Sequence, residues 1–294
     1  MKWLLESSER EKIKEMAMTE RFLEGRVAWV TGGASGMGRA MALSLAEAGA
    51  DIAVGSLLES EGDRVTGELA YLPGEEELRA VQSEIEGHGV KAFCAGLDVT
   101  SDSSVENFFN QATEGLGPVD ILANAAGITA EQTLCGHDHS LWNKVIDVNL
   151  NGTYRTSRLC LPAMMERGWG RIINIASTAA SVGAATSGAY CASKAGVVGL
   201  SRCIALESAS RGVTCNTISP TWVETSFGRD WMTNIAEVQE SRSGEAYIDD
   251  ARAANPQQRL IQPEEVGALA RYLCSEHARG ITMQDLTLSG GSLW

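Results

Sequence analysis

The chain has 294 residues, of which 44% are hydrophobic and 21% are charged, and its net charge is −14. A chain of this length can bury the core of one large α/β domain, and the composition is ordinary for a soluble globular protein. The acidic excess argues against a nucleic-acid partner, because phosphate binding requires a surplus of Lys and Arg.

Cysteine usage and hydropathy favour a cytoplasmic protein. The seven cysteines are an odd number and include no CxxC pair, so we expect free thiols rather than disulfides or a metal site. No apolar run approaches the ~18 residues that a membrane helix requires. Glu6 follows the start too soon for the apolar core of a signal peptide.

Residues 1–24 are charge-rich and helical in pattern, and we interpret them as an N-terminal extension. They could form a helix that lies on the domain or a tail, and Met16 or Met18 could be the true start. We assign residues 25–294 to a single domain.

After Gly25, short apolar runs alternate with helical segments. The predicted strands are residues 27–31, 51–55, 91–96, 119–123, 171–176, 213–218 and 285–288. The predicted helices include residues 36–48, 103–114, 140–166 and 188–211. Nearly continuous apolar strands that alternate with helices predict an α/β fold, with a doubly wound parallel sheet covered on both faces. In such sheets, ligands bind beyond the C-terminal ends of the strands.

Two segments are longer than this alternation requires. Residues 57–90 are rich in glutamate and contain Pro73-Gly74, and we expect two short helices separated by that turn. Residues 221–262 follow a strand end and carry Trp222, Phe227 and Trp231. This second segment is either a lid that closes over a ligand or a packed surface loop.

A tyrosine and a lysine, Tyr190 and Lys194, stand four residues apart in a predicted helix. This spacing places them on one helix face, where the ammonium could lower the pKa of the phenol from its usual value near 10. Ser177, at the end of the preceding strand, could hold a carbonyl or alcohol oxygen beside the tyrosine. With a nucleotide site nearby, the set indicates proton transfer coupled to hydride transfer.

Two segments rich in small residues could provide that nucleotide site. The glycine-rich turn at residues 31–38 follows the first strand and opens a helix. Glycines there let backbone N–H groups and the helix N-terminus approach a pyrophosphate, although such turns also serve simple packing. Asn124-Ala125-Ala126-Gly127 ends the fourth strand, where small residues bring backbone close to a cofactor or serve packing.

These motifs occur in a characteristic order along the chain. They are Thr-Gly-x-x-x-Gly-x-Gly (31–38), Asp98 in Leu-Asp-Val-Thr, Asn-Ala-Ala-Gly (124–127), Asn149 in Val-Asn-Leu-Asn-Gly, Ser177, and Tyr190-x-x-x-Lys194. Together they resemble the short-chain dehydrogenase/reductase family in its compact single-domain form, over nearly everything after Gly25. The resemblance implies a Rossmann-type doubly wound seven-stranded parallel sheet. It also implies an NAD(P)-dependent oxidoreductase that interconverts a secondary alcohol and a ketone without a metal.

The resemblance further implies a catalytic tetrad of Asn149, Ser177, Tyr190 and Lys194. Tyr190 is then the general acid/base, and Ser177 hydrogen-bonds the reacting oxygen. Lys194 lowers the pKa of the tyrosine and binds the nicotinamide ribose. Asn149 helps to hold a water that links the lysine to solvent.

The implied cofactor site includes the pyrophosphate cradle, an adenine contact at Asp98 and a carboxamide contact at Thr225. Its residues are Gly32, Ser35, Gly36, Met37, Gly38, Ser56, Asp98, Val99, Asn124, Ala125, Gly127, Tyr190, Lys194, Pro220, Val223 and Thr225. Many NAD-dependent members carry an aspartate at the end of the second strand, where this chain has Ser56. That absence leaves NADP open, yet no Lys or Arg stands at Ser35 or around Ser56. We favour NAD slightly over NADP.

Besides Ser56, two further departures from the family pattern are Pro220-Thr221 in place of Pro-Gly, and Met283 and Ser289 where a glycine and an aspartate are common. Trp294 either reaches the active site of a neighbouring subunit or packs in an interface. We expect a homotetramer or homodimer in which the helices at 140–166 and 188–211 face symmetry mates. Small residues near Ser177 and aromatic residues in 221–262 suggest an uncharged cyclic or aromatic substrate. The alternatives are a non-catalytic nucleotide-sensing or scaffold protein on the same fold, or another reaction such as dehalogenation or epimerisation.

Overall fold

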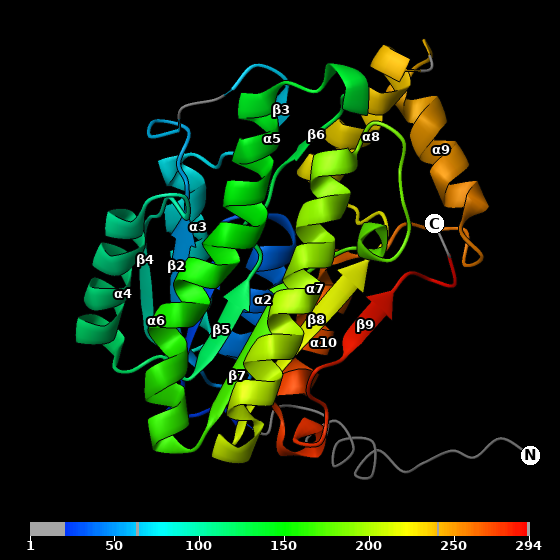
Figure 1. The fold of residues 1–294 in the computed structure, drawn as a ribbon. Helices are drawn as coiled ribbons and strands as arrows, with labels where there is room; N and C mark the ends of the chain where they lie inside the picture. Colours follow the sequence, from blue (N-terminus) through cyan, green and yellow to red (C-terminus); the bar gives the residue numbers. More distant parts are fainter. Residues whose placement is uncertain (1–20, 63–64, 240, 293–294) are drawn as a thin grey trace, which may run out of the picture.

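The protein is seen in a computed structural model that describes residues 21–62, 65–239 and 241–292 (Figure 1). The expectations for residues 1–20, including the two possible starts, and for Trp294 lie outside the described residues. Residues 22–25 form a turn that leads into the first strand.

The centre of the described chain is a seven-stranded sheet in the order β4-β2-β1-β5-β7-β8-β9, with every neighbouring pair parallel. The strands are β1 (Val27–Thr31), β2 (Asp51–Ser56), β4 (Ala92–Gly96), β5 (Ile121–Asn124), β7 (Gly170–Ile175), β8 (Val213–Pro220) and β9 (Asp285–Leu288). The predicted doubly wound, seven-stranded parallel sheet is confirmed. Strand order reverses on either side of β1, which places the switch point, and hence the expected ligand site, at the ends of β1 and β5.

Helices cover both faces of the sheet (Figure 1). One layer holds α2 (Gly36–Glu47), α3 (Glu75–Gly87) and α10 (Pro263–Cys274). The other holds α4 (Asp102–Leu116), α5 (His139–Ile146), α6 (Gly152–Arg167) and α7 (Gly188–Ser208). Side chains alternate across β1: Trp29 stacks on Phe108 of α4 at 5.3 Å, whereas Val30 belongs to the core on the α2 side. Burial on both faces explains the continuous apolar runs in the sequence.

The segment 57–90 departs from its prediction. Only its second half is helical, as α3, and the described residues of 57–73 contain no helix. Instead β3 (Glu68–Leu69) pairs antiparallel with β6 (Thr129–Ala130). Gly67, at φ +86°, adopts a backbone conformation that interrupts a helix. The backbone of Glu68 and Leu69 pairs with β6 instead.

Residues 140–166 form the predicted helical rod with one widened turn. A π-helical turn at Asp147–Asn151 joins α5 to α6. The segment 221–262 contains α8 (Ser226–Gln239) and α9 (Gly244–Ala254), and a bridge between Val223 and Ile261 ties its two ends together. Within the described ranges, no helix is both long enough and apolar enough to span a bilayer.

Candidate active site

The glycine-rich turn between β1 and α2 is built so that only glycine fits at its key positions. A Cβ on Gly38 would lie 2.2 Å from the Gly32 carbonyl oxygen, and a Cβ on Gly32 would lie 2.8 Å from the Ala126 nitrogen. Gly32 and Gly36 also have positive φ angles, of +65° and +50°. The turn therefore lies tightly against the loop after β5 and opens directly into the N-terminus of α2, which is suited to bind an anion such as a pyrophosphate.

Side-chain hydroxyls hold this turn in place. The Thr31 Oγ1 accepts hydrogen bonds from the backbone N–H groups of Ala125 and Ala126, each at 3.2 Å. The Ser56 Oγ accepts one from Ala34 N–H at 3.1 Å. The ends of β1, β2 and β5 are thus cross-linked at the switch point of the sheet.

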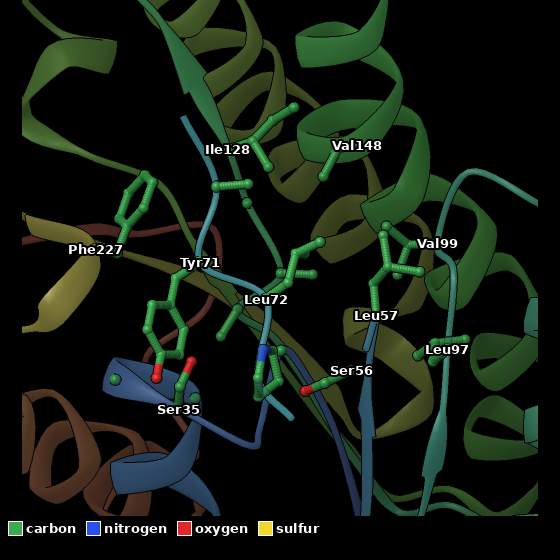
Figure 2. A pocket seen from close by; sticks show the side chains of 18 of the residues that line it. Ser35, Ser56, Leu57, Tyr71, Leu72, Leu97, Val99, Ile128, Val148 and Phe227 are labelled. Atoms are coloured by element: carbon green, nitrogen blue, oxygen red, sulfur yellow. The ribbon is translucent and has the colours of Figure 1, made fainter. Parts of the chain in front are cut away.

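Two cavities open above these strand ends. The first is seen from close by in Figure 2, and its lining includes ten of the residues predicted to bind the cofactor. These are Gly32, Ser35, Gly36, Met37, Gly38, Ser56, Asp98, Val99, Ala125 and Gly127. The second cavity is lined by the predicted residues Ser177, Tyr190, Lys194, Pro220 and Val223, among others. Because both cavities share Met37, Ala125, Gly127 and Phe227, they form one continuous groove.

Two residues of the expected cofactor site do not line this groove. The Asn124 side chain turns into the core, where its Nδ2 donates to Asn174 at 2.8 Å and its Oδ1 accepts from Thr156 at 2.7 Å. Thr225 lines a neighbouring cavity together with Ser35 and Gly36. Their predicted contacts with a cofactor stay predictions.

Ser177 and Tyr190 meet at the closed end of the groove. Ser177 follows β7, Tyr190 lies in the first turn of α7, and both side chains line the second cavity. Ser177 Oγ accepts from Ala179 N–H at 3.2 Å. Burial raises the pKa of Tyr190 to about 12, and the neighbouring Ser177 hydroxyl opposes this shift without cancelling it. The phenol is therefore protonated at neutral pH.

Lys194 lies one turn further along α7 and is equally enclosed. Its Nζ donates to the Ile175 carbonyl at 2.8 Å and lies 5.6 Å from the centre of the Tyr190 ring. Burial lowers the pKa of the ammonium to about 8. Burial is the main cause of the Tyr190 shift and Lys194 is not among its causes, so the expectation that Lys194 lowers the pKa of Tyr190 stays a prediction.

Asn149 occupies the π-helical turn and is fully buried. Its Oδ1 accepts from Ile128 N–H at 2.9 Å, and its Nδ2 donates to the Ile128 carbonyl at 3.0 Å and to Ser193 Oγ at 2.9 Å. A Cβ on Gly127 would meet both Asn149 Oδ1, at 3.4 Å, and Lys194 Nζ, at 3.5 Å. The four residues of the expected tetrad therefore lie close together, although they belong to three separate segments of the chain. One of these segments is a π-helical turn, and such turns are frequent at functional sites.

Aromatic side chains close the groove above Tyr190. Trp231 of α8 packs edge-on against Tyr190, with ring centres 4.8 Å apart, and contacts Trp222 in the same way. The Trp231 indole N–H donates to Glu131 at 2.7 Å, and Ser187 donates to the same carboxylate at 2.7 Å. Glu131 was not predicted. No sequence motif marks its position, because its partners Ser187 and Trp231 are remote in sequence.

The segment after β2 was also missed as part of the site. Tyr71, Leu72 and Pro73 line the first cavity, as do Ile128 and Val148 (Figure 2). The excess length of residues 57–90 was the available signal, but it gave no indication that the chain crosses the groove. Among the described residues, no three His, Cys, Asp or Glu side chains gather in a group that could hold a metal ion.

Comparison with known proteins identifies relatives over almost the whole chain. The family model described as enoyl-(acyl carrier protein) reductase matches residues 32–292. D-beta-hydroxybutyrate dehydrogenase of Cupriavidus necator is 34% identical, over 92% of this chain and 98% of its own. The 3-oxoacyl-(acyl-carrier-protein) reductase of Vibrio harveyi is 35% identical, over 92% of this chain and 98% of its own.

A solved structure of similar fold is that of an actinorhodin polyketide ketoreductase variant with NADPH. It has a TM-score of 0.81 and 35% sequence identity, and the match covers 90% of this chain and 96% of that one.

Proposed function

Because this chain belongs to the short-chain dehydrogenase/reductase family, and is therefore an oxidoreductase that interconverts an alcohol and a carbonyl compound, we propose that Asn149, Ser177, Tyr190 and Lys194 perform its chemistry. The observation that carries this proposal is that Ser177, Tyr190 and Lys194 line one cavity, which is continuous with the groove that begins at the glycine cradle. The substrate that fits this pair is a secondary alcohol or the corresponding ketone.

The groove suits a nicotinamide dinucleotide, because the glycine cradle would hold its pyrophosphate and the cavity beside Tyr190 its nicotinamide. Gly32, Gly36 and Gly38 would hold the pyrophosphate, Asp98 and Val99 would flank the adenine, and Lys194 would bind the nicotinamide ribose. The bound dinucleotide supplies the hydride acceptor or donor, and the protein supplies orientation and proton handling.

Proton transfer is assigned to Tyr190. In the direction of reduction, the protonated phenol donates its proton to the substrate oxygen as that oxygen gains electron density. In the direction of oxidation, the phenolate accepts the hydroxyl proton of the alcohol. Ser177 donates a hydrogen bond to the substrate oxygen and positions it beside the phenol. Asn149, by fixing the Ile128 backbone and the π-helical turn, positions the loop after β5 against Lys194.

For the cofactor we favour NAD over NADP. The cavities that a dinucleotide would occupy contain the basic residues Arg39 and Lys144. Arg39 forms an ion pair with Glu84, and Lys144 belongs to α5, one turn before Val148. Arg39 is therefore not an unopposed partner for a 2′-phosphate next to Ser35 and Ser56, which supports NAD.

The segment 221–262 is proposed to act as the lid of the active site. Its Trp222, Phe227 and Trp231 line the second cavity from above, whereas small residues such as Ala176 line it from the strand side. An apolar, aromatic wall supports an uncharged cyclic or aromatic substrate. The hydroxybutyrate and acyl carrier protein substrates in the names of the relatives are charged, and the cavity lining offers them no arginine.

We further propose that the protein works in the cytoplasm as a homotetramer or homodimer. The outer sides of α6 and α7 support an assembly, since they expose Tyr154 and Leu206, at 50% and 73% of their surfaces. The domain is proposed to extend over residues 25–294, with residues 1–24 as an extension.

A panel of secondary alcohols tests the proposed substrate class. Cyclic and aromatic alcohols, 3-hydroxybutyrate and sugars are each incubated with NAD and, in parallel, with NADP, and nicotinamide reduction is followed by absorbance. The expected result is turnover of cyclic or aromatic alcohols, with a higher kcat/KM for NAD than for NADP. Turnover of 3-hydroxybutyrate alone would reject the substrate assignment, and no turnover of any alcohol would reject the proposed function.

A further inference from the structure

The strand β2 does not end on an acid that could accept a hydrogen bond from a ribose hydroxyl. β2 ends at Ser56, whose hydroxyl accepts a bond from the Ala34 N–H of the glycine turn, and the next residue is Leu57. In a dinucleotide the adenosine ribose lies between the adenine and the pyrophosphate. In the groove it therefore belongs between Asp98 and the glycine turn, where Ser35, Ser56 and Tyr71 line the cavity.

Tyr71 reaches this place from a segment that crosses the groove, residues 65–74, which we call the strap. One end of the strap is fixed by the pairing of Glu68 and Leu69 with β6, and the other by Gly74, the N-cap of α3. Between these ends, Tyr71, Leu72 and Pro73 line the cavity. Figure 2 shows the Tyr71 ring extending toward Ser35, and both residues line the first cavity as well as its neighbour over the glycine turn.

A carboxylate stands directly behind the Tyr71 hydroxyl. Tyr71 Oη donates to Glu77 Oε1 at 2.6 Å, and Gly74 N–H donates to Glu77 Oε2 at 2.9 Å. Both carboxylate oxygens of Glu77 thus accept hydrogen bonds, which fix the position of its negative charge next to the Tyr71 hydroxyl. Glu77 also lines the neighbouring cavity, together with Tyr71, Ser35 and Gly36.

The surroundings of this pair are acidic. The hydrogen bond to Glu77 and burial raise the pKa of Tyr71 to about 12, and the charges of Glu77, Asp230 and Glu59 add to the shift. Tyr71 is therefore a neutral phenol at physiological pH. The basic residue in the lining of the neighbouring cavity, Arg39, is paired with Glu84 and does not offset the charge of Glu77.

We propose that Tyr71 and Glu77 together discriminate the adenosine ribose of the cofactor and select NAD over NADP, in place of the acid that the end of β2 lacks. This inference rests on the proposed function. A ribose 2′-hydroxyl can donate a hydrogen bond to the Tyr71 oxygen, whose own proton is directed to Glu77. A 2′-phosphate has no such proton to donate at neutral pH and adds a charge of about −1.5 to −2 beside a fixed carboxylate.

The test compares Glu77→Gln with Glu76→Gln. Both variants remove one negative charge from the first turn of α3, but Glu76 does not line either cavity. Glutamine retains the capping role at this helix position, so the helix is expected to form in both variants. Dissociation constants for NAD and NADP are measured by quenching of intrinsic tryptophan fluorescence at low ionic strength, where the charge is least screened.

We expect wild type to bind NAD more tightly than NADP. Glu77→Gln should raise the affinity for NADP relative to NAD by about 5- to 10-fold, whereas Glu76→Gln should change the ratio by less than about 2-fold. In Tyr71→Phe, which removes the acceptor oxygen but keeps the ring, NAD affinity should fall by about 3- to 10-fold. Arg39→Ala should leave the ratio unchanged.

Three results would overturn the inference. They are a wild type that binds NADP at least as tightly as NAD, equal shifts in Glu77→Gln and Glu76→Gln, and a loss of NADP binding in Arg39→Ala. The last result would mean that Arg39 leaves Glu84 to hold the 2′-phosphate. Binding of the dinucleotides without turnover of any alcohol would count against the proposed function alone, since the ratio of affinities still decides the roles of Tyr71 and Glu77. A wild type that binds neither dinucleotide would reject both.

Discussion

Burial changes the pKa values of Tyr190 and Lys194 so that the neutral form of each side chain is favoured. The pKa of Tyr190 is raised to about 12 and that of Lys194 is lowered to about 8, in each case chiefly by burial. At neutral pH the site therefore holds a phenol and an ammonium, which is the state needed to protonate a ketone. Oxidation of an alcohol requires the phenol to lose its proton first.

The lowered pKa of Lys194 makes its charge sensitive to pH in an accessible range. Below about pH 8 the ammonium is charged and can bind ribose hydroxyls, and above this pH the charge is lost. We expect the affinity of wild type for NAD to fall by about 3- to 10-fold between about pH 7 and about pH 9. Fluorescence titration with NAD at the two pH values measures this change.

An arginine at the same position provides the control, because its guanidinium remains charged over the whole range. Lys194→Arg should show no such fall, and Lys194→Met should bind NAD weakly and equally at both pH values. The same pH dependence in wild type and in Lys194→Met would mean that another group titrates.

At this scale the sequence indicated which residues meet but not their protonation. The spacing of Tyr190 and Lys194 and the order of the motifs were sufficient to predict that these two residues lie near Ser177. All three line one cavity in the structure. Their pKa values depend on enclosure by Trp231 and Val223, from a segment that lies more than one element away. No local pattern carries that information.

Secondary-structure elements were predictable where their pattern is periodic and uninterrupted. The strap is the clearest exception, because its short strand pairs with Thr129–Ala130, about sixty residues later in the chain. A two-residue strand has no periodicity to detect, and the glutamate-rich composition suggested a helix that begins only at Glu75.

The widened turn in the helix at 139–167 could not be predicted either. Residues on both sides continue the helical pattern, so the sequence indicated one helix across 140–166. The π-helical turn contains Asn149, whose side-chain amide accepts a hydrogen bond from the Ile128 N–H and donates one to the Ile128 carbonyl. The tertiary contact with the loop after β5, rather than local propensity, decides this geometry.

Three aromatic residues of 221–262 lie at the candidate site. Trp222, Phe227 and Trp231 all line the second cavity, and α8 holds Trp231 over Tyr190 through the bond to Glu131. Whether the segment moves stays a prediction. The carboxylate that anchors it was not foreseeable, since Glu131 stands in a loop with no motif of its own.

The sheet topology was the most predictable feature of the whole molecule. Each predicted strand overlaps a strand of the structure, because a parallel sheet buried on both faces leaves continuous apolar runs in the sequence. The glycine turn after β1 then indicated a candidate ligand site at the switch point of the sheet.

The exposed side of α7 leads to a prediction about assembly. Leu206 is 73% exposed there, and burying such a side chain in an interface contributes about 1.5–3 kcal/mol. We expect Leu206→Glu to weaken the proposed dimer or tetramer, so that light scattering during size-exclusion chromatography gives a smaller mass than wild type. Leu134→Glu is the matched control, because Leu134 is 77% exposed in the loop before α5. That loop is bridged to Ser187 at the N-cap of α7, the opposite end of the helix from Leu206. A wild type that is already monomeric, or equal effects of both substitutions, would contradict the prediction.

The central claim is that the Tyr190 hydroxyl transfers the proton in an alcohol–ketone reaction. Its most direct test is the initial rate of nicotinamide reduction by wild type and by Tyr190→Phe, with the best alcohol of the panel and at the same dinucleotide saturation. Phenylalanine keeps the ring that packs against Trp231 and removes only the proton donor. We predict that kcat falls by about 10²- to 10⁴-fold while the dissociation constant of the dinucleotide changes by less than about 3-fold. Full turnover by Tyr190→Phe would contradict the account.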